Sequence, residues 1–310
     1  MYQPQTGMIS NAEFIAKLIE FSSTIPTIKT GKHEQFYNVP AGFDIETTSF
    51  YNPRGEKSAI MYEWTLGIYN FITYGRTWNQ FKILLDAVSK ILGTHEKNRL
   101  VIYVHNLPYE FQFMRKHFSW TKVFLLDDRK PVYAITDSGI EFRCSLKLSG
   151  KSLASTAQDL TKYKVEKMVG DLDYSLIRHS KTPLTEKELN YCEHDVRVIL
   201  HYIQEKIEQD GNIARIPLTN TGYVRRYTKD ACFPERRIYE DASTYDLDDI
   251  GAIGVYRAER VLSRWIHARE CPPRPETLHE SWLVRLHEFL SCRYGSRKVS
   301  NIERQVSWFS

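Results

Sequence analysis

The sequence predicts an α/β layer fold in which a mixed sheet is flanked by helices. Short runs with the two-residue alternation of β-strands lie between longer runs with the apolar spacing of amphipathic helices. Along the chain the order is helix, antiparallel strands, helix, a buried strand, helix, further strands and a long helix. This order is typical of a single layered domain rather than of an all-α or all-β chain.

The first half of the chain provides two helices and three strands. Residues 11–22 have helical spacing, with Asn11 as a candidate N-cap, and a polar stretch follows to about Pro40. Three strands joined by short turns are expected next, over 40–48, 59–68 and 70–75. Residues 77–93 form an amphipathic pattern that should end as a helix at Gly93.

The second half adds strands and the most regular helix of the sequence. A buried strand is expected over 99–106 and a helix over 108–118, and strands follow over 121–126, 131–136 and 140–146. Residues 184–209 predict a long helix, because Thr185 and Glu188 form a capping box at its start and Gly211 stops it.

Composition restricts the compartment and the partners. The chain has 310 residues, 42% of them hydrophobic, and a formal net charge of +4, which permits a nucleic-acid partner without requiring one. Five cysteines include no C-x-x-C pair, which favours reduced thiols in the cytoplasm, the host cytoplasm if the protein is viral. No signal peptide or membrane span is visible, so we expect a soluble protein without a membrane partner.

The last fifth of the chain has a different composition. Residues 251–310 contain one lysine and nine arginines, and a boundary is expected between 233 and 250. We expect this tail to be atypical or disordered and to add nothing to catalysis. A zinc site is one alternative, although its five candidate ligands fit no usual spacing: His267, Cys271, His279, His287 and Cys292.

Two acids interrupt the first predicted strand, which reads AGFDIETT. Asp44 and Glu46 are two residues apart, so they share one face of the strand, while Phe43 and Ile45 share the other. Two neighbouring carboxylates repel each other, and burial increases the repulsion, so a positive group is expected between them. A surface strand with two solvated acids is the ordinary alternative.

Further acids follow at the ends of later elements. Glu110 lies where a strand gives way to a helix, and Tyr191 and Asp195 share one face of the long helix. Such acids suit two magnesium or manganese ions that hydrolyse a phosphodiester, with Tyr191 positioning the attacking water. Taken singly, each residue also has an ordinary structural role, such as a first-turn acid, a surface ion pair or a core tyrosine.

Three segments together resemble the exonuclease motifs of the DEDD proofreading nucleases. These are FDIETT, HNLPYEF at 105–111 and YCEHD at 191–195, and GDLDY at 170–174 resembles a stretch before the third motif. The closest resemblance is to the N-terminal exonuclease region of the protein-primed family B DNA polymerases of bacteriophages and linear plasmids. It covers about residues 39–232 and implies an RNase H-like mixed sheet flanked by helices.

The resemblance also implies roles for individual residues. Asp44, Glu46 and Asp195 would hold the two metal ions, Glu110 would replace the fourth acid, and Tyr191 would complete the catalytic set. Contacts to a single-stranded 3′ end would come from Thr47, His105, Asn106 and Tyr109, although His105 could equally be structural. Lys167 is the nearest candidate for the lysine that stabilises phosphate in the family.

Two departures from the family pattern stand out. Glu110 replaces the usual aspartate and reaches about 1.5 Å further. The polymerase motifs Y-x-D-T-D-S and K-x-x-x-N-S-x-Y-G are missing, so we expect a truncated chain that does not polymerise. The expected domains are an N-terminal extension (1–38), the exonuclease domain (39–210), a connection towards a missing palm (211–250) and the tail (251–310).

The expected function is 3′→5′ proofreading exonuclease activity, as part of a protein-primed DNA-directed DNA polymerase. The expected partners are a single-stranded DNA 3′ end and a terminal priming protein. Two alternatives stay open at this point: a free-standing DEDD exonuclease that acts on RNA, and a non-catalytic nucleic-acid-binding module. Metal-dependent cleavage of an oligonucleotide distinguishes the enzymes from the binding module.

Overall fold

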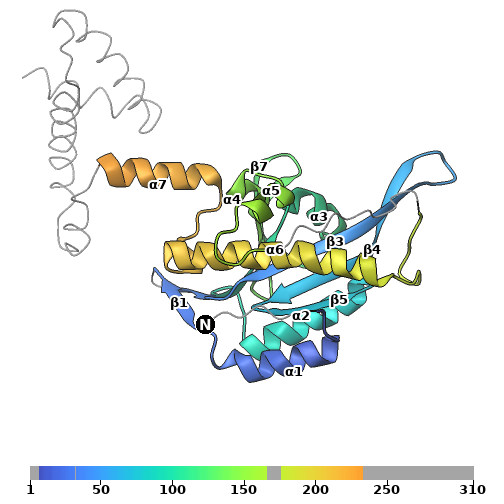
Figure 1. The fold of residues 1–310 in the computed structure, drawn as a ribbon, viewed down its shortest axis with the longest axis horizontal. Coiled ribbons are helices and arrows are strands. Elements are labelled where there is room, and N and C mark those ends of the chain that lie inside the picture. Colours follow the sequence, from blue (N-terminus) through green and yellow to red (C-terminus); the bar gives the residue numbers. More distant parts are fainter. Residues whose placement is uncertain (1–6, 32, 166–175, 233–310) are drawn as a thin grey trace, which may run out of the picture. The chain divides into compact units, whose positions relative to one another are not determined.

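A mixed sheet forms the centre of the computed structural model, which describes residues 7–31, 33–165 and 176–232 (Figure 1). Helices pack on both faces of this sheet. The expected fold class is therefore confirmed. None of the helices in this described part is long and apolar enough to cross a membrane.

The sheet has nine strands among the described residues, and seven of them follow the order β5-β4-β3-β6-β9-β8-β7. Strand β3 is antiparallel to β4 and parallel to β6, and β6 is parallel to β9. The bounds are β1 (Thr27–Thr30), β2 (Glu34–Tyr37), β3 (Ala41–Tyr51), β4 (Lys57–Ile68), β5 (Phe71–Gly75), β6 (Asn98–Val104), β7 (Trp120–Asp127), β8 (Lys130–Thr136) and β9 (Ile140–Cys144).

The helices are distributed over the two faces of the sheet. Their bounds are α1 (Asn11–Ser22), α2 (Trp78–Leu92), α3 (Leu107–Met114), α4 (Ser145–Ser149), α5 (Leu153–Gln158), α6 (Glu186–Asp210) and α7 (Asn220–Cys232), with the 3₁₀ turn η1 (Ile213–Arg215). Residues of α1, α2 and α3 share one hydrophobic core with β3 and β4. Helix α6 packs on the opposite face and lies across the strands in Figure 1.

Local sequence signals explain where the two longest helices begin and end. The capping boxes Thr77–Gln80 and Thr185–Glu188 are both present at the starts of α2 and α6. Both helices end at a glycine in the left-handed region, with φ of 61° at Gly93 and 87° at Gly211. The latter helix therefore has the start and the stop that its sequence predicted.

Two local expectations were wrong. The N-cap of α1 is Ser10, whose hydroxyl accepts a hydrogen bond from the Glu13 backbone N–H at 3.2 Å, and Asn11 is already helical. The stretch before Pro40, described only as polar and given no predicted strand, contains the hairpin β1–β2. Strand β2 pairs with β6, and its Phe36 packs in the core on the α6 face.

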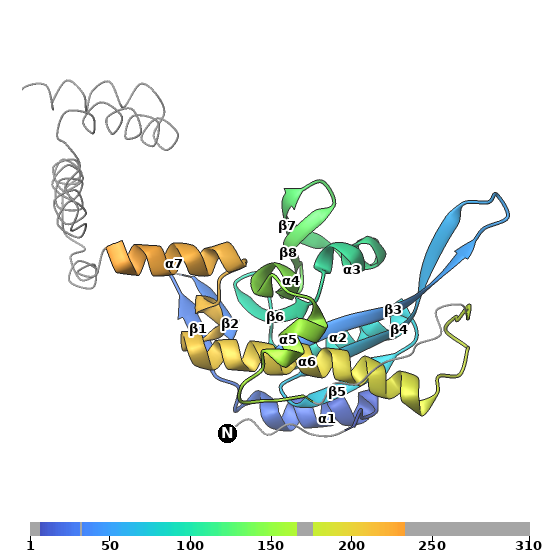
Figure 2. The same ribbon diagram turned by 45° about the horizontal axis from the view of Figure 1, so that its top comes forward.

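Two hairpins extend beyond the layered body (Figure 2). One is formed by β3 and β4, whose far ends continue past the strands that flank them; the other is formed by β7 and β8. The β3–β4 hairpin matters for the site, because its base carries Asp44 and Glu46. The expected tail at 251–310 and its candidate zinc ligands lie outside the described residues.

Candidate active site

Strand β3 presents two acids on the face of the sheet that α6 covers. Asp44 and Glu46 are half-buried, whereas Phe43 and Ile45 are buried in the core on the opposite face. The alternation of the sequence produces this separation, because side chains of a strand point alternately to its two faces. Both acids are therefore directed towards the helix layer rather than towards bulk solvent.

Helix α6 brings Asp195 to these acids because it packs very close to the sheet. A Cβ added at Gly67 would lie 2.7 Å from the nearest α6 side-chain atom, and one at Gly42 would lie 2.9 Å from it. Heavy atoms do not approach so closely, so a Cβ at either position would require the α6 side chains or the helix itself to shift. The close approach places a helix residue within reach of strand residues.

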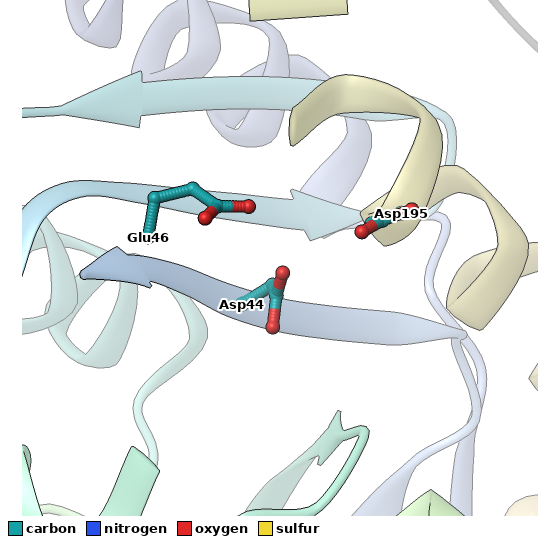
Figure 3. Close-up of side chains that lie close together, drawn as sticks. All are labelled: Asp44, Glu46 and Asp195. Carbon is teal, nitrogen blue, oxygen red and sulfur yellow. The ribbon is translucent and has the colours of Figure 1, made fainter. Parts of the chain in front are cut away.

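Asp44, Glu46 and Asp195 form a tight cluster of carboxylates (Figure 3). One ligand oxygen from each acid lies within 4.8 Å of a ligand oxygen from each of the other two. Within the described residues, no other group of three or more acids, histidines or cysteines is as close together. Oxygen ligands from carboxylates are those preferred by magnesium and manganese. The three predicted metal ligands, contributed by two elements far apart in sequence, thus lie at one place.

The charges of this cluster are strongly unfavourable without a cation. Burial raises the pKa of Asp44 well above its usual range, and the nearby carboxylates of Glu110, Glu46 and Asp195 raise it further. Burial and Asp195 raise the pKa of Glu46 to about 7, while the Arg178 guanidinium acts in the opposite direction. A divalent cation would relieve this repulsion by supplying the missing positive charge.

Glu110 lies at the beginning of α3, next to the three clustered acids. Asn106 has a φ of 77° as the chain turns from β6 into this helix, and Glu110 follows in the first turn. Its side chain is buried, and its Oε2 atom has no hydrogen-bond partner. Burial raises the pKa of Glu110 to about 8. A buried carboxylate oxygen without a partner, beside three other acids, fits a cation or its water ligands.

Four of the five predicted substrate-binding residues lie among the described residues. Tyr109 is 42% exposed, and its hydroxyl lies 2.5 Å from the Thr47 hydroxyl, so the hydrogen bond joins α3 to β3. Asn106 is exposed. His105 is half-buried, its Nδ1 lies 3.1 Å from the Ser145 hydroxyl, and burial lowers its pKa to about 4. The neutral imidazole and its protein partner fit the structural alternative that the sequence left open.

Two predicted site residues remain, Tyr191 and Lys167. Tyr191 is half-buried in the first part of α6, one turn before Asp195, as their spacing predicted. Lys167 lies outside the described residues, as does the GDLDY segment.

Sequence reasoning missed two charged residues of the site. Glu63 on β4 is 1% exposed and lies opposite Glu46 in the strand register. Arg178 is buried, and its Nε donates to Glu188 Oε1 at 2.6 Å. A single glutamate inside the apolar run of β4 was a detectable signal for Glu63. The Arg178 guanidinium lowers the pKa of Glu46, and no local pattern marks this residue.

The depth of α6 provides a first testable prediction. Gly67→Ala should push α6 away from the sheet, and a displacement of about 1 Å is enough to lower an enzymatic rate about 100-fold. The divalent-metal affinity should fall with it. Gly75→Ala is the matched control, because its Cβ would meet Trp64 in the opposite core and not α6. If both variants lose stability but keep the parent's metal affinity, the close approach of α6 does not determine the site.

Comparisons with solved structures identify the fold. A ternary complex of Phi29 DNA polymerase with primer-template DNA and incoming nucleotides matches with a TM-score of 0.51 and 15% identity, over 68% of this chain and 37% of that chain. A binary complex of the same polymerase with primer-template DNA matches with a TM-score of 0.50 and 15% identity, over 68% and 38% of the two chains. No protein-family model and no curated protein matches the sequence.

A more distant likeness is found to the catalytic core of RRP6 from Trypanosoma brucei, with a TM-score of 0.39 and 11% identity over 69% of this chain and 52% of that chain. The chain spans little more than a third of the length of the polymerase that it matches. The sequence resemblance and the Phi29 comparison agree on the fold: the described part of the chain has an RNase H-like mixed sheet flanked by helices.

Proposed function

We propose that this chain is a 3′→5′ exonuclease that uses two magnesium or manganese ions. The observation that carries the proposal is the cluster of Asp44, Glu46 and Asp195, whose ligand oxygens lie within 4.8 Å of one another. The buried, unpartnered oxygen of Glu110 beside them supports it. Acids that raise one another's pKa in this way are typical of sites that hold cations.

The residues of the site suit hydrolysis of a phosphodiester. Two bound cations would supply Lewis acidity towards the attacking water and the leaving oxygen. Asp44, Glu46 and Asp195 would hold these cations, and Glu110, one methylene longer than the family's aspartate, would reach them directly or through water. Tyr191 would orient the attacking water through its hydroxyl, because a phenol with a pKa of about 10 is a poor base near neutral pH.

A single-stranded DNA 3′ end is the proposed substrate. Tyr109 offers an exposed ring beside the acids, held at its hydroxyl by Thr47, and stacking of a base on such a ring is worth about 1–3 kcal/mol. Asn106 offers an exposed amide on the same turn. The Phi29 polymerase structures of similar fold hold primer-template DNA, which favours DNA over RNA.

The larger context is also a proposal. The resemblance to protein-primed polymerases suggests a proofreading role in replication, in the cytoplasm of a host cell, with a terminal protein as partner. The proposed division places the exonuclease domain at 39–210, after an extension at 1–38, and the connection at 211–250 before the tail at 251–310.

Cleavage of 5′-labelled oligonucleotides tests the proposed function. We expect stepwise shortening from the 3′ end, release of nucleotide 5′-monophosphates, and complete loss of cleavage when the divalent metal is chelated. Single-stranded and frayed ends should be cut faster than a blunt duplex, because a protein with a net charge of only +4 binds the phosphates of a duplex weakly. The matched arms are the same sequence as DNA, as RNA and as blunt DNA duplex.

The other possible outcomes would each indicate a different function for this chain. Faster shortening of RNA than of DNA would indicate the free-standing RNA exonuclease. Binding of the oligonucleotide without any cleavage, in magnesium or manganese, would indicate a non-catalytic binding module. Equal rates on single strands and blunt duplexes would contradict a proofreading site that accepts one unpaired strand.

A further inference from the structure

Glu63 is a buried carboxyl beside the acid cluster to which no role has been given so far. It lies on β4 opposite Glu46 of β3, so the two side chains share the face of the sheet that α6 covers. Only 1% of its surface is exposed. Burial of a carboxyl group costs free energy, so an acid this deeply buried is rare unless it has hydrogen-bond partners or a function.

The partners of Glu63 join strand β4 to helix α6. The Thr65 hydroxyl, on the same strand, donates to Glu63 Oε1 at 2.6 Å. The thiol of Cys192, on α6 and 3% exposed, makes a second hydrogen bond with the same carboxyl. Both contacts are with protein groups, and Glu63 does not belong to the cluster of Asp44, Glu46 and Asp195. Its surroundings are those of an anchor rather than of a metal ligand.

This anchor lies next to the helix turn that carries Asp195. On one side of Asp195, the side chains of Val196 and Leu200 contact the sheet at Gly67. On the other side, Cys192 is hydrogen-bonded to Glu63. Asp195 therefore lies on α6 between two attachments to the strands. The close contacts of α6 at Gly42 and Gly67 both involve residues that follow Asp195, so the contact with Glu63 adds an attachment on the other side of this residue.

We propose that Glu63 is a positioning residue: through its hydrogen bonds to Thr65 and Cys192 it holds α6 so that Asp195 completes the metal-binding cluster with Asp44 and Glu46. The inference rests on the proposed function, since it assigns Glu63 to the same metal site. A positioning role differs from that of a metal ligand, because Glu63 acts through its hydrogen bonds to protein groups and not through a bond to the cation. Outer partners of this kind usually contribute 10- to 100-fold in metal affinity.

Direct Mn²⁺ binding to the full chain tests this proposal, measured by the loss of the electron paramagnetic resonance signal of free Mn²⁺. Glu63→Ala should weaken Mn²⁺ binding about 10- to 100-fold, because it removes the connection to α6. Glu63→Gln should bind Mn²⁺ nearly as well as the parent, because the amide oxygen still accepts hydrogen bonds. Cys192→Ala should weaken binding in the same direction as Glu63→Ala, and Cys192→Ser should restore it.

Glu141→Ala is the matched control for the loss of a buried strand carboxyl. Glu141 is 3% exposed on β9 and is paired with Arg99 and Arg143, away from the acid cluster. It should lower the melting temperature without changing Mn²⁺ affinity. All variants are measured at a temperature where circular dichroism shows a folded chain, so that a change in affinity is separated from a loss of stability.

Two results would overturn the proposal. Equal loss of affinity in Glu63→Gln and Glu63→Ala would mean that the charge binds the cation, and parent-like affinity in Glu63→Ala would mean that Glu63 only fills space. The readout does not depend on cleavage. If the parent binds Mn²⁺ and Glu63→Ala binds it weakly, while no oligonucleotide is cut, then the proposed nuclease function fails and the positioning role stands. A parent that binds no Mn²⁺ would refute the positioning role.

Discussion

Asp44→Asn is expected to abolish cleavage of a single-stranded 3′ end and, at the same time, to raise the melting temperature of the metal-free protein. The rate should fall by roughly 1,000-fold or more, because metal-ion catalysis supplies several kcal/mol and each 1.4 kcal/mol is a factor of ten. Stability should rise because the carboxylate of Asp44 is unfavourable among Glu110, Glu46 and Asp195 when no cation is bound.

These two opposite effects make the result specific. A residue that only supports the fold loses activity and stability together when it is changed, whereas a charged functional residue loses activity and gains stability. Single-turnover cleavage at saturating magnesium and thermal unfolding with chelator at pH 8 measure the two effects. Glu20→Gln, at an exposed acid of α1, is the control and should change neither. Parent-like cleavage by Asp44→Asn would refute the site.

Much of the site could be predicted because its residues are marked by local patterns. The alternation of Phe43, Asp44, Ile45 and Glu46 alone places the two acids on one face of a strand. The capping box at Thr185 fixes the start of α6, and helical periodicity then determines which residues share a face with Asp195. The resemblance of the three segments to the exonuclease motifs, and not the local patterns alone, predicted that Asp44, Glu46 and Asp195 lie at one place.

The parts that could not be predicted depend on contacts between elements. Glu63 becomes part of the site because the register of β3 and β4 places it opposite Glu46, and a bulge follows this pair on the way to the hairpin end. Arg178 influences Glu46 from the segment before α6, where its side chain donates to Glu188 and its backbone N–H donates to the Thr48 hydroxyl. Strand register and the path of an irregular segment are set by tertiary packing, which a sequence pattern does not specify.

The hairpin β1–β2 illustrates the same limit for the fold. Its strands have four residues each, too short for a convincing alternation, and the second ends with two consecutive buried residues, Phe36 and Tyr37, instead of an alternation. Pairing of β2 with β6 stabilises these residues as a strand, since the neighbouring strand supplies hydrogen bonds that the local sequence does not demand.

Without divalent metal, the protein is expected to become less stable as the pH rises from 6.5 to 8.5. The pKa values of Glu46, at about 7, and of Glu110 and Glu63, at about 8, are raised above the usual value of 4.5, mainly by burial. In this interval the native chain still binds protons that the unfolded chain has already released. The free energy of unfolding therefore falls with pH, because it decreases wherever the native state holds more protons.

The interval is chosen so that other groups do not reverse the sign. Burial lowers the pKa values of His105 and His201 from 6.5 to about 4, so these histidines make the native state more stable as the pH rises, and this effect fades above about pH 7.5, where the unfolded imidazoles have also lost their protons. Below pH 6.5 the histidines and the acids oppose each other. Above it, the titrating acids beside the cluster dominate, and the predicted direction is unambiguous.

Divalent metal should remove this pH dependence. A cation bound to the ionised acids stabilises the native state by about 2.7 kcal/mol at a concentration 100 times its Kd, and this gain grows with pH as protons cease to compete. Melting curves at pH 6.5, 7.5 and 8.5, each with chelator and with manganese, measure the effect. Asp44→Asn should show a smaller decline with chelator and little response to manganese. A metal-free melting temperature that rises between pH 6.5 and 8.5 would contradict the raised pKa values of Glu46, Glu63 and Glu110.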